Sequence, residues 1–354
     1  MNNLDDRIRL RSRSTLRYIR PPHEQQFALT DVLTGLQERI MGQAQAIDEI
    51  VPYVRMFQAG LAPEGRPAGV FLLLGPTGTG KTRTVEALAE VLHGSSKNLL
   101  KVDCAEFQME HEVAKLIGAP PGYLGHRETH PLLTQAKLAS VATERCGVSI
   151  VLFDEIEKAA QTMTRLLLGI LDKGTLRLGD NNTVSFEKTL IFLTSNIGAR
   201  RMMKQLTPSF GFGSSMDPEA AAQPAKLHQI ASNAARRQFS PEFMNRIDEV
   251  ITYKPLDTPA LKAILDQQLQ DLQTHVLRRL GARGFKIVVQ NKAKSFLLKE
   301  GTSLQYGARE IKRTVHRHLA QPIAEMVASN LVPSGANLYA EVNSRGDRLK
   351  LRAA

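Results

Sequence analysis

The chain has 354 residues, of which 42% are hydrophobic and 23% charged, which is typical of a folded protein of about two domains. No apolar run approaches the ~18–20 residues of a membrane span, and the polar start from Met1 to Asp6 lacks the apolar stretch of a secretory signal, so we expect no membrane partner. The formal net charge of +11 allows a nucleic acid, an anionic lipid or an acidic polypeptide as partner but does not indicate a fold. Cys104 and Cys146 form neither a metal-ligand pattern nor a disulfide framework, which favours the reducing cytoplasm.

Residues 1–30 are predicted to form a basic N-terminal arm. Two aspartates accompany six arginines before Pro21-Pro22, namely Arg7, Arg9, Arg11, Arg13, Arg17 and Arg20. Closely spaced like charges repel one another, so we interpret the arm as a disordered, solvated segment. The alternative is a docking arm for an acidic surface.

Residues 31–254 alternate short apolar runs with helical periods. The runs at residues 70–74, 99–102, 149–153, 190–193 and 250–253 are bounded by turn residues and predict buried parallel strands. Between them, apolar residues three and four apart predict helices, as at residues 85–92 and at residues 163–171, where Gly174 follows as a C-cap. The alternation predicts an α/β fold with a mostly parallel sheet flanked by helices, which we assign to a large domain over residues 31–254.

Residues 255–354 are predicted to form a smaller α+β domain. A long helix over residues 261–280 ends at Gly281, and helical patches follow at residues 293–298 and 311–331. Strands are expected at residues 285–289, 338–342 and 349–351. The Gly-, Ser-, Ala- and Pro-rich stretch at residues 209–224 of the large domain is predicted to be a surface loop.

A phosphate-binding loop follows the first predicted strand. Gly75-Pro76-Thr77-Gly78-Thr79-Gly80-Lys81-Thr82 matches the pattern G-x-x-x-x-G-K-[ST] and leads into an amphipathic helix. Glycines allow the backbone N–H groups to surround phosphates, and the helix N-terminus adds a partial positive charge. Lys81 is expected to contact the β- and γ-phosphates of ATP, and Thr82 to help hold Mg²⁺.

Polar residues end two further predicted strands. Asp154 and Glu155 follow residues 149–153. Placing two carboxylates at the end of a buried strand costs free energy of folding unless they bind a cation or a water molecule. Asp154 is expected to hold the Mg²⁺ hydration shell and Glu155 to activate the attacking water, which indicates an ATPase rather than a kinase. Asn196 follows residues 190–193, and its amide can position that water.

Further segments resemble the AAA+ ATPase module of the Clp chaperone family, most closely the second ATPase ring of ClpB-type disaggregases. The resemblance runs from about residue 36 to residue 342. It rests on motifs in family order, namely Arg39-Ile40-Met41-Gly42-Gln43, similar to the adenine-side segment; residues 116–125, similar to the pore loop; residues 239–248, similar to the arginine-finger segment; and residues 306–313, similar to the sensor-two helix.

The resemblance implies a function and further site residues. Ile40 and Met41 would lie beside the adenine, Arg309 would contact the same nucleotide in cis, and Arg246 would reach the nucleotide of a neighbouring subunit in trans. Both arginine roles imply a homo-oligomeric ring, which is hexameric in the family. Tyr123 would grip unfolded or aggregated protein substrates in the central pore, with residues 173–180 as a second pore-facing loop. The function expected is therefore an ATP-dependent unfoldase or remodelling chaperone.

Three alternatives remain open. Phe210-Gly211-Phe212 lies where protease-linked Clp ATPases carry a loop that docks a peptidase ring, so the chain is alternatively the ATPase subunit of a Clp-like protease. The net charge and the basic arm also allow a nucleic-acid motor or loader, although no base-reading motif accompanies the charge. A non-hydrolysing nucleotide switch is disfavoured because it would not need Glu155.

Overall fold

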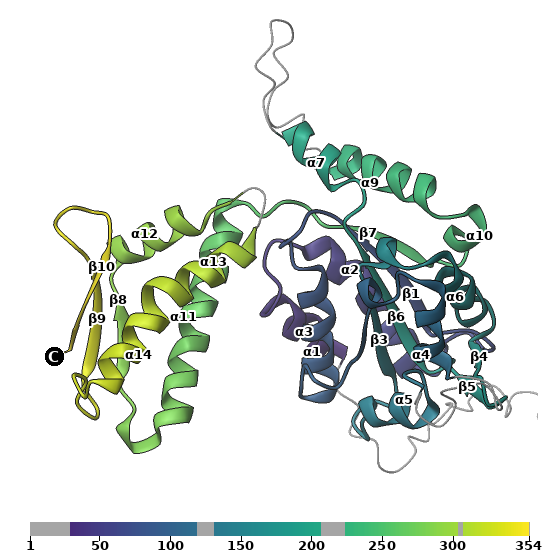
Figure 1. Ribbon diagram of the computed structural model, residues 1–354, viewed down its shortest axis with the longest axis horizontal. Helices are drawn as coiled ribbons and strands as arrows, with labels where there is room; N and C mark the ends of the chain where they lie inside the picture. The colour runs from purple at the N-terminus through teal and green to yellow at the C-terminus, as the bar shows by residue number, and fades with distance from the viewer. Residues whose placement is uncertain (1–28, 119–130, 207–223, 304–306, 354) are drawn as a thin grey trace, which may run out of the picture.

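The computed structural model describes residues 29–118, 131–206, 224–303 and 307–353, which form a large and a small lobe (Figure 1). The predicted arm up to residue 28, Tyr123 and Phe210-Gly211-Phe212 lie outside these residues. Among the described helices, none has the length and the apolar character to cross a lipid bilayer.

The large lobe is built on a five-stranded sheet in which all neighbouring strands are parallel. Its order is β2-β3-β6-β1-β7, with strands at Gly69–Leu74 (β1), Leu100–Asp103 (β2), Ser149–Asp154 (β3), Thr189–Ser195 (β6) and Glu249–Thr252 (β7). Each of the five apolar runs forms a strand, so the predicted α/β class with a mostly parallel sheet is confirmed. Because the strands are parallel, the loops that carry polar residues leave from one edge of the sheet.

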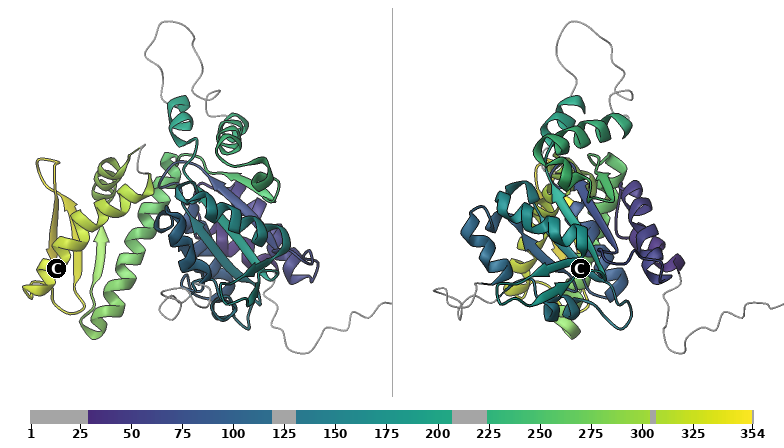
Figure 2. Two further views of the ribbon diagram at one scale, coloured as in Figure 1. Left: turned by 45° about the vertical axis from the view of Figure 1, so that its right-hand side comes forward. Right: turned by 90° about the vertical axis from the view of Figure 1, so that its right-hand side faces the viewer.

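Helices cover both faces of this sheet (Figure 2). One face packs against α1 (Leu29–Gln37), α2 (Ala44–Gln58) and α3 (Lys81–His93). The other packs against α4 (Ala114–Ile117), α5 (Gln135–Val141), α6 (Gln161–Lys173), α9 (Pro224–Gln238) and α10 (Pro241–Met244). Side chains of β1 alternate between the two cores, because successive residues of a strand point to opposite faces. The lobe also contains α7 (Ala199–Leu206), beside α9, and three short 3₁₀ helices, η1 (Cys104–Glu106), η2 (Glu110–Val113) and η3 (Ile156–Lys158).

A short hairpin follows α6. Gly174 ends the helix with a left-handed φ of 59°, as predicted for a C-cap, and leads into β4 (Thr175–Arg177), which pairs antiparallel with β5 (Thr183–Ser185). Residues 173–180 are predicted to be a pore-facing loop, and they contain β4, whose three residues are too few to show an alternating pattern. At the hairpin turn, the Gly179 N–H donates to the Ile117 carbonyl at 2.8 Å, so the hairpin lies beside the end of α4.

The small lobe is a three-stranded sheet covered by helices. Its sheet has the order β10-β9-β8, with β8 (Lys286–Val289) parallel to β9 (Asn337–Val342) and β10 (Leu349–Ala353) antiparallel to it. The helices are α11 (Thr258–Leu280), η4 (Gly281–Arg283), α12 (Asn291–Gly301), α13 (Ala308–Val315) and α14 (Gln321–Ala328), with a π-helical turn, η5 (His316–Ala320), between the last two. The smaller C-terminal α+β unit is thus confirmed. The helical patch predicted to reach residue 331 ends at Ala328, and Asn330 has a left-handed φ of 52°.

Candidate nucleotide site

The phosphate-binding loop leaves β1 at the carboxyl edge of the sheet and enters α3. Gly75, Gly78 and Gly80 have φ values of 151°, 76° and 106°, a region that residues with a Cβ rarely adopt. At Gly75 a Cβ would also lie 2.6 Å from the Tyr253 carbonyl oxygen. The glycine spacing is therefore required by the backbone path and by close packing against the segment after β7.

Lys81 begins α3 with its ammonium group buried inside this loop. The Nζ atom donates to the carbonyl oxygens of Gly75 at 2.7 Å and Pro76 at 2.9 Å, and to Asn196 Oδ1 at 3.0 Å. Burial lowers the pKa of Lys81 to about 8, although the carboxylates of Glu157 and Asp154 oppose that effect. The group is still protonated at neutral pH and is ready to bind an anion.

Asp154 ends β3 beside Thr82. The Thr82 hydroxyl donates to Asp154 Oδ1 at 3.3 Å, Thr194 also donates to this carboxylate, and Lys101 forms an ion pair with it at 2.8 Å. Burial raises the pKa of Asp154, but the hydrogen bonds from Lys101 and Thr194 outweigh it, and the pKa lies below its usual value. The side chain is therefore an anion that can accept a cation.

Glu155 adopts a left-handed backbone conformation with φ 58°, which is uncommon for a residue with a side chain and is concentrated at functional sites. Its Oε1 atom accepts a hydrogen bond from Asn196 Nδ2 at 3.3 Å, and Lys158 forms an ion pair with Oε2. Because Asn196 also accepts from Lys81, one amide links the ammonium of the phosphate loop to the Glu155 carboxylate.

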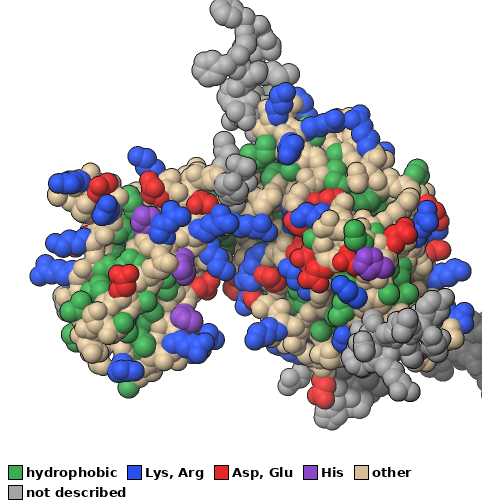
Figure 3. Space-filling model, in the orientation of Figure 1, with side chains coloured by type: hydrophobic (Ala, Val, Ile, Leu, Met, Phe, Trp, Pro, Cys, Tyr) green, Lys and Arg blue, Asp and Glu red, His purple; other side chains and the backbone are tan. Residues whose placement is uncertain are grey.

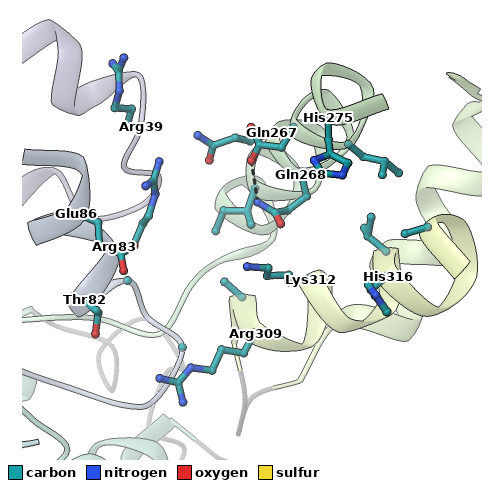
Figure 4. Close-up of a pocket in the computed structure, with 18 of the residues that line it drawn as sticks. Arg39, Thr82, Arg83, Glu86, Gln267, Gln268, His275, Arg309, Lys312 and His316 are labelled. Carbon is teal, nitrogen blue, oxygen red and sulfur yellow. Dashed lines mark hydrogen bonds between the residues drawn. The ribbon is translucent and has the colours of Figure 1, made fainter. Parts of the chain in front are cut away.

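These residues line a cleft of about 1420 Å³ between the lobes. Ile40, Met41 and residues 77–82 contribute its large-lobe wall, and Arg309 contributes from α13 of the small lobe. Figure 4 shows Arg309 pointing from the small lobe toward the chain before Thr82. Gly75 and Pro76 do not line the cleft. Their carbonyl groups accept the hydrogen bonds of Lys81. The structure thus brings together most of the candidate residues.

Direct backbone contact joins the small lobe to the phosphate loop. The Ala308 N–H donates to the Gly78 carbonyl at 3.0 Å. At Gly307, where φ is 51°, a Cβ would lie 2.7 Å from the same carbonyl oxygen. Only glycine fits here, and this contact sets the position of Arg309, two residues further on.

Arg246 is not part of the cleft. It follows α10, on the side of the large lobe away from the small lobe (Figure 1), and its Nε atom forms an ion pair with Asp172 of α6 at 2.8 Å. Arg246 is predicted to reach a neighbour's nucleotide, and its position outside the lining of its own chain's cleft is compatible with that hypothesis. No second copy is described here, so the role stays a prediction.

The fold brings three charged residues to this site that the sequence motifs did not indicate. Lys101 of β2 pairs with Asp154, Lys158 pairs with Glu155, and Glu157 accepts a hydrogen bond from the Asn196 backbone N–H at 3.0 Å. The available signal for Lys101 was a lysine inside the otherwise apolar run at residues 99–102. Gln43 was noted only as part of a motif, yet its amide donates to the carbonyls of Thr79 and Lys254 and ties the loop to the end of β7.

The oxygen atoms near Lys81 suit Mg²⁺ better than a structural metal. No group of three or more His, Cys, Asp or Glu residues that could hold a metal ion occurs within the described ranges. Mg²⁺ usually takes only one or two protein ligands and keeps several waters, and the Thr82 hydroxyl and the Asp154 carboxylate fit that requirement.

Comparisons with known proteins agree with this architecture. Residues 66–250 match the AAA domain (Cdc48 subfamily), and residues 256–340 match the C-terminal, D2-small domain of ClpB protein. This chain belongs to the AAA+ family of Clp chaperone ATPases. The AAA+ membership confirms the resemblance stated from the motifs.

Two curated AAA+ relatives are each 36% identical to this chain. The chaperone protein ClpB of Meiothermus ruber aligns over 304 residues, and the ATP-dependent Clp protease ATP-binding subunit ClpC of Staphylococcus aureus over 292 residues. The alignments cover 86% and 82% of this chain but only 33% and 34% of the relatives, so the chain spans about one third of their length. A solved structure, a closed-state cryo-EM reconstruction of Hsp104 with ATPγS and FITC casein, has a TM-score of 0.75 and 26% identity, and covers 92% of this chain and 51% of that chain.

We predict that Gly307→Ala weakens binding of a fluorescent ATP analogue about tenfold, because the added Cβ forces Ala308 and Arg309 away from the phosphate loop. The matched control is Gly335→Ala, which has the same left-handed backbone requirement, φ 72°, but no atom within 4 Å of its Cβ. Equal affinities of the two variants in a fluorescence titration would contradict the role of this contact.

Proposed function

We propose that this AAA+ protein is an ATP-dependent protein unfoldase or remodelling chaperone that works as a ring. The observation that carries the proposal is the cluster of Lys81, Asp154, Glu155 and Asn196 at one edge of the sheet. The cluster lies in a cleft whose other wall is the small lobe, which contacts the phosphate loop at Gly78. The cluster has every group that ATP hydrolysis requires in one chain except a trans arginine.

The side chains divide the work of hydrolysis. Bound Mg²⁺·ATP supplies the phosphoryl group and the cation that neutralises its oxygens. Lys81 leaves the carbonyls of Gly75 and Pro76 for the β- and γ-phosphates, while Thr82 and Asp154 hold the cation. Glu155 accepts the proton of the attacking water, and the Asn196 amide, already within reach of Glu155, holds that water in place.

Two arginines connect hydrolysis to the assembly. Arg309 contacts the nucleotide in cis and so relates its state to the position of the small lobe. Arg246 acts in trans, leaving Asp172 to stabilise the transition-state charge on a neighbour's nucleotide. Closed rings are the usual result of such head-to-tail contacts, and we propose a hexamer by analogy with the Clp family.

The substrate is proposed to pass through the centre of this ring. Tyr123 belongs to residues 119–130, which follow α4 in the sequence. After this segment, the Leu132 N–H donates to the Lys115 carbonyl of α4 at 3.1 Å. The β4–β5 hairpin meets the same place through Gly179 and Ile117. Both segments assigned to the pore therefore start from one point of the large lobe. The Hsp104 relative was solved with FITC casein, which supports a polypeptide substrate.

We predict that Glu155→Gln retains binding of a fluorescent ATP analogue but loses about 10²–10⁴-fold in ATP turnover, because the amide cannot accept the water's proton. Glu187→Gln, an exposed residue of the loop before β6, serves as the control with the same chemical change and leaves turnover unaltered. A phosphate-release assay makes the comparison, and turnover of the Glu155 variant within a few-fold of wild type would refute the assignment.

Replacement of Tyr123 separates threading from hydrolysis. Tyr123→Ala is expected to keep basal ATP turnover and to abolish ATP-driven unfolding of a tagged fluorescent protein, because the loop loses its aromatic grip. Tyr123→Phe keeps the ring and should unfold the substrate at nearly the wild-type rate. Unfolding by the alanine variant as fast as by the phenylalanine variant would show that Tyr123 does not grip the substrate.

A second candidate function is the ATPase subunit of a Clp-like protease. It is favoured by the ClpC relative, whose identity to this chain equals that of ClpB. Phe210-Gly211-Phe212, the proposed docking segment for a peptidase ring, lies outside the described residues. The ATPase chemistry proposed above is the same in either case.

A further inference from the structure

The interdomain cleft extends beyond the phosphate loop along the small lobe. There it is lined by residues of α11 and of the continuous segment α13–η5–α14. We call this part the small-lobe groove and define it by six lining residues, Leu272, Val276 and Leu280 on α11 and Ala320, Ala324 and Ala328 on η5 and α14. The space-filling view shows an open hollow between the two lobes (Figure 3).

The two walls of the small-lobe groove have the geometry of a helix-binding site. Its α11 residues and its alanines each recur every four residues, so each set forms a row along one face of its helix. Alanine side chains allow close approach of another backbone, and Ala324 and Ala328 are exposed. Amphipathic helices bind in such grooves through apolar residues at similar spacing.

Basic residues, four of them Lys or Arg, flank the small-lobe groove on both sides. Lys312, Arg313, His316 and Arg317 follow one another along α13 and η5 and line an adjoining hollow, while His275 and Arg279 lie on α11. All six are exposed. Figure 4 shows that His275, Lys312 and His316 border one common space. The rim of the groove is therefore a cationic surface.

Few carboxylates neutralise this rim. Arg313 pairs with Glu310 at 3.4 Å, but no described carboxylate forms an ion pair with Lys312, Arg317 or Arg279. Asp271 is the one acidic residue that the described small lobe contributes to the cleft lining, and its carboxylate accepts a hydrogen bond from Gln268 at 3.3 Å. The unneutralised positive charge favours an anionic occupant.

The backbone is unusual where the rim crosses the groove. His316–Ala320 form a π-helical turn in which the Gln321 N–H donates to the His316 carbonyl, five residues earlier. Such turns are rare and often lie at functional sites. Here the turn carries two rim residues, His316 and Arg317, and one groove residue, Ala320.

We propose that the small-lobe groove binds an acidic amphipathic helix of a partner protein. The apolar walls pack against the apolar face of the helix, and the flanking Lys and Arg side chains form ion pairs with its carboxylates. The basic N-terminal arm of this chain has the wrong charge to be the occupant. This docking function is independent of polypeptide threading, because none of the residues involved belongs to the pore or to the hydrolytic cluster.

The probe for this proposal is a fluorescein-labelled synthetic peptide of three heptads, with leucine at the a and d positions and glutamate at most others. Its fluorescence anisotropy is measured with the full chain in the absence of nucleotide. We expect saturable binding that weakens as salt is added, and weaker binding of a peptide with the same composition in scrambled order. Tyr123→Ala should bind the probe as well as wild type does, which separates the groove from the pore.

The decisive variant is the double charge reversal Arg279→Glu/Lys312→Glu, which should weaken binding about tenfold or more. Its control, Lys299→Glu/Lys350→Glu, makes the same change in net charge at exposed residues of α12 and β10 outside the cleft and should bind normally. Ala324→Glu, which blocks the groove and adds a negative charge, should also abolish binding. Circular dichroism verifies that each variant is folded.

Three results would overturn the proposal. The first is equal binding by the two double variants, which would mean that only net charge attracts the peptide. The second is loss of binding in Tyr123→Ala, which would place the peptide in the pore. The third is a wild-type chain that does not bind the peptide, together with an Ala324→Glu variant whose oligomeric mass is lower than that of the wild type. That result would mean that a second copy of this chain covers the groove.

Discussion

The parallel arrangement of β1, β3 and β6 is the constraint on which the rest of the molecule depends. It places the phosphate loop, Asp154 with Glu155, and Asn196 at the same edge of one sheet, although Lys81 and Asn196 are separated by 115 residues in sequence. The cost of burying the Lys81 ammonium is offset by loop carbonyls and by the Asn196 amide. That amide also reaches Glu155, so a ligand that draws Lys81 away changes the surroundings of the proposed water activator.

A second constraint is the contact between the lobes. The small lobe touches the phosphate loop through backbone atoms at Gly78 and Ala308, and Gly307 leaves no space for a side chain. The start of α13 is therefore held directly against the phosphate loop. The same helix carries Arg309 toward the nucleotide site and Lys312 toward the small-lobe groove. One short helix therefore borders both the nucleotide site and the small-lobe groove.

Sequence patterns predict the parts of this structure that local chemistry determines. Buried parallel strands are continuous apolar runs, and the phosphate loop is identified by glycines whose φ values only glycine adopts readily. Lys101 and Lys158 were missed because their roles depend on which strand lies beside which and on the turn after Glu155. The π-helical turn and the groove were missed for a similar reason, since no local residue pattern marks the turn and the groove depends on which helices of the small lobe lie side by side. The predicted domain boundary between residues 254 and 255, and the roles of Arg246 and Tyr123, stay predictions.

The central claim is that a site with its own Lys81 and Glu155 is completed by Arg246 of an adjacent copy. Complementation between two inactive variants tests it most directly. Arg246→Ala retains Glu155, and Glu155→Gln retains Arg246, so mixing them in equal parts recreates complete sites at some interfaces. With free exchange of subunits, the account predicts recovery of up to about one quarter of wild-type ATP turnover. No recovery in mixtures that demonstrably form joint assemblies would contradict it.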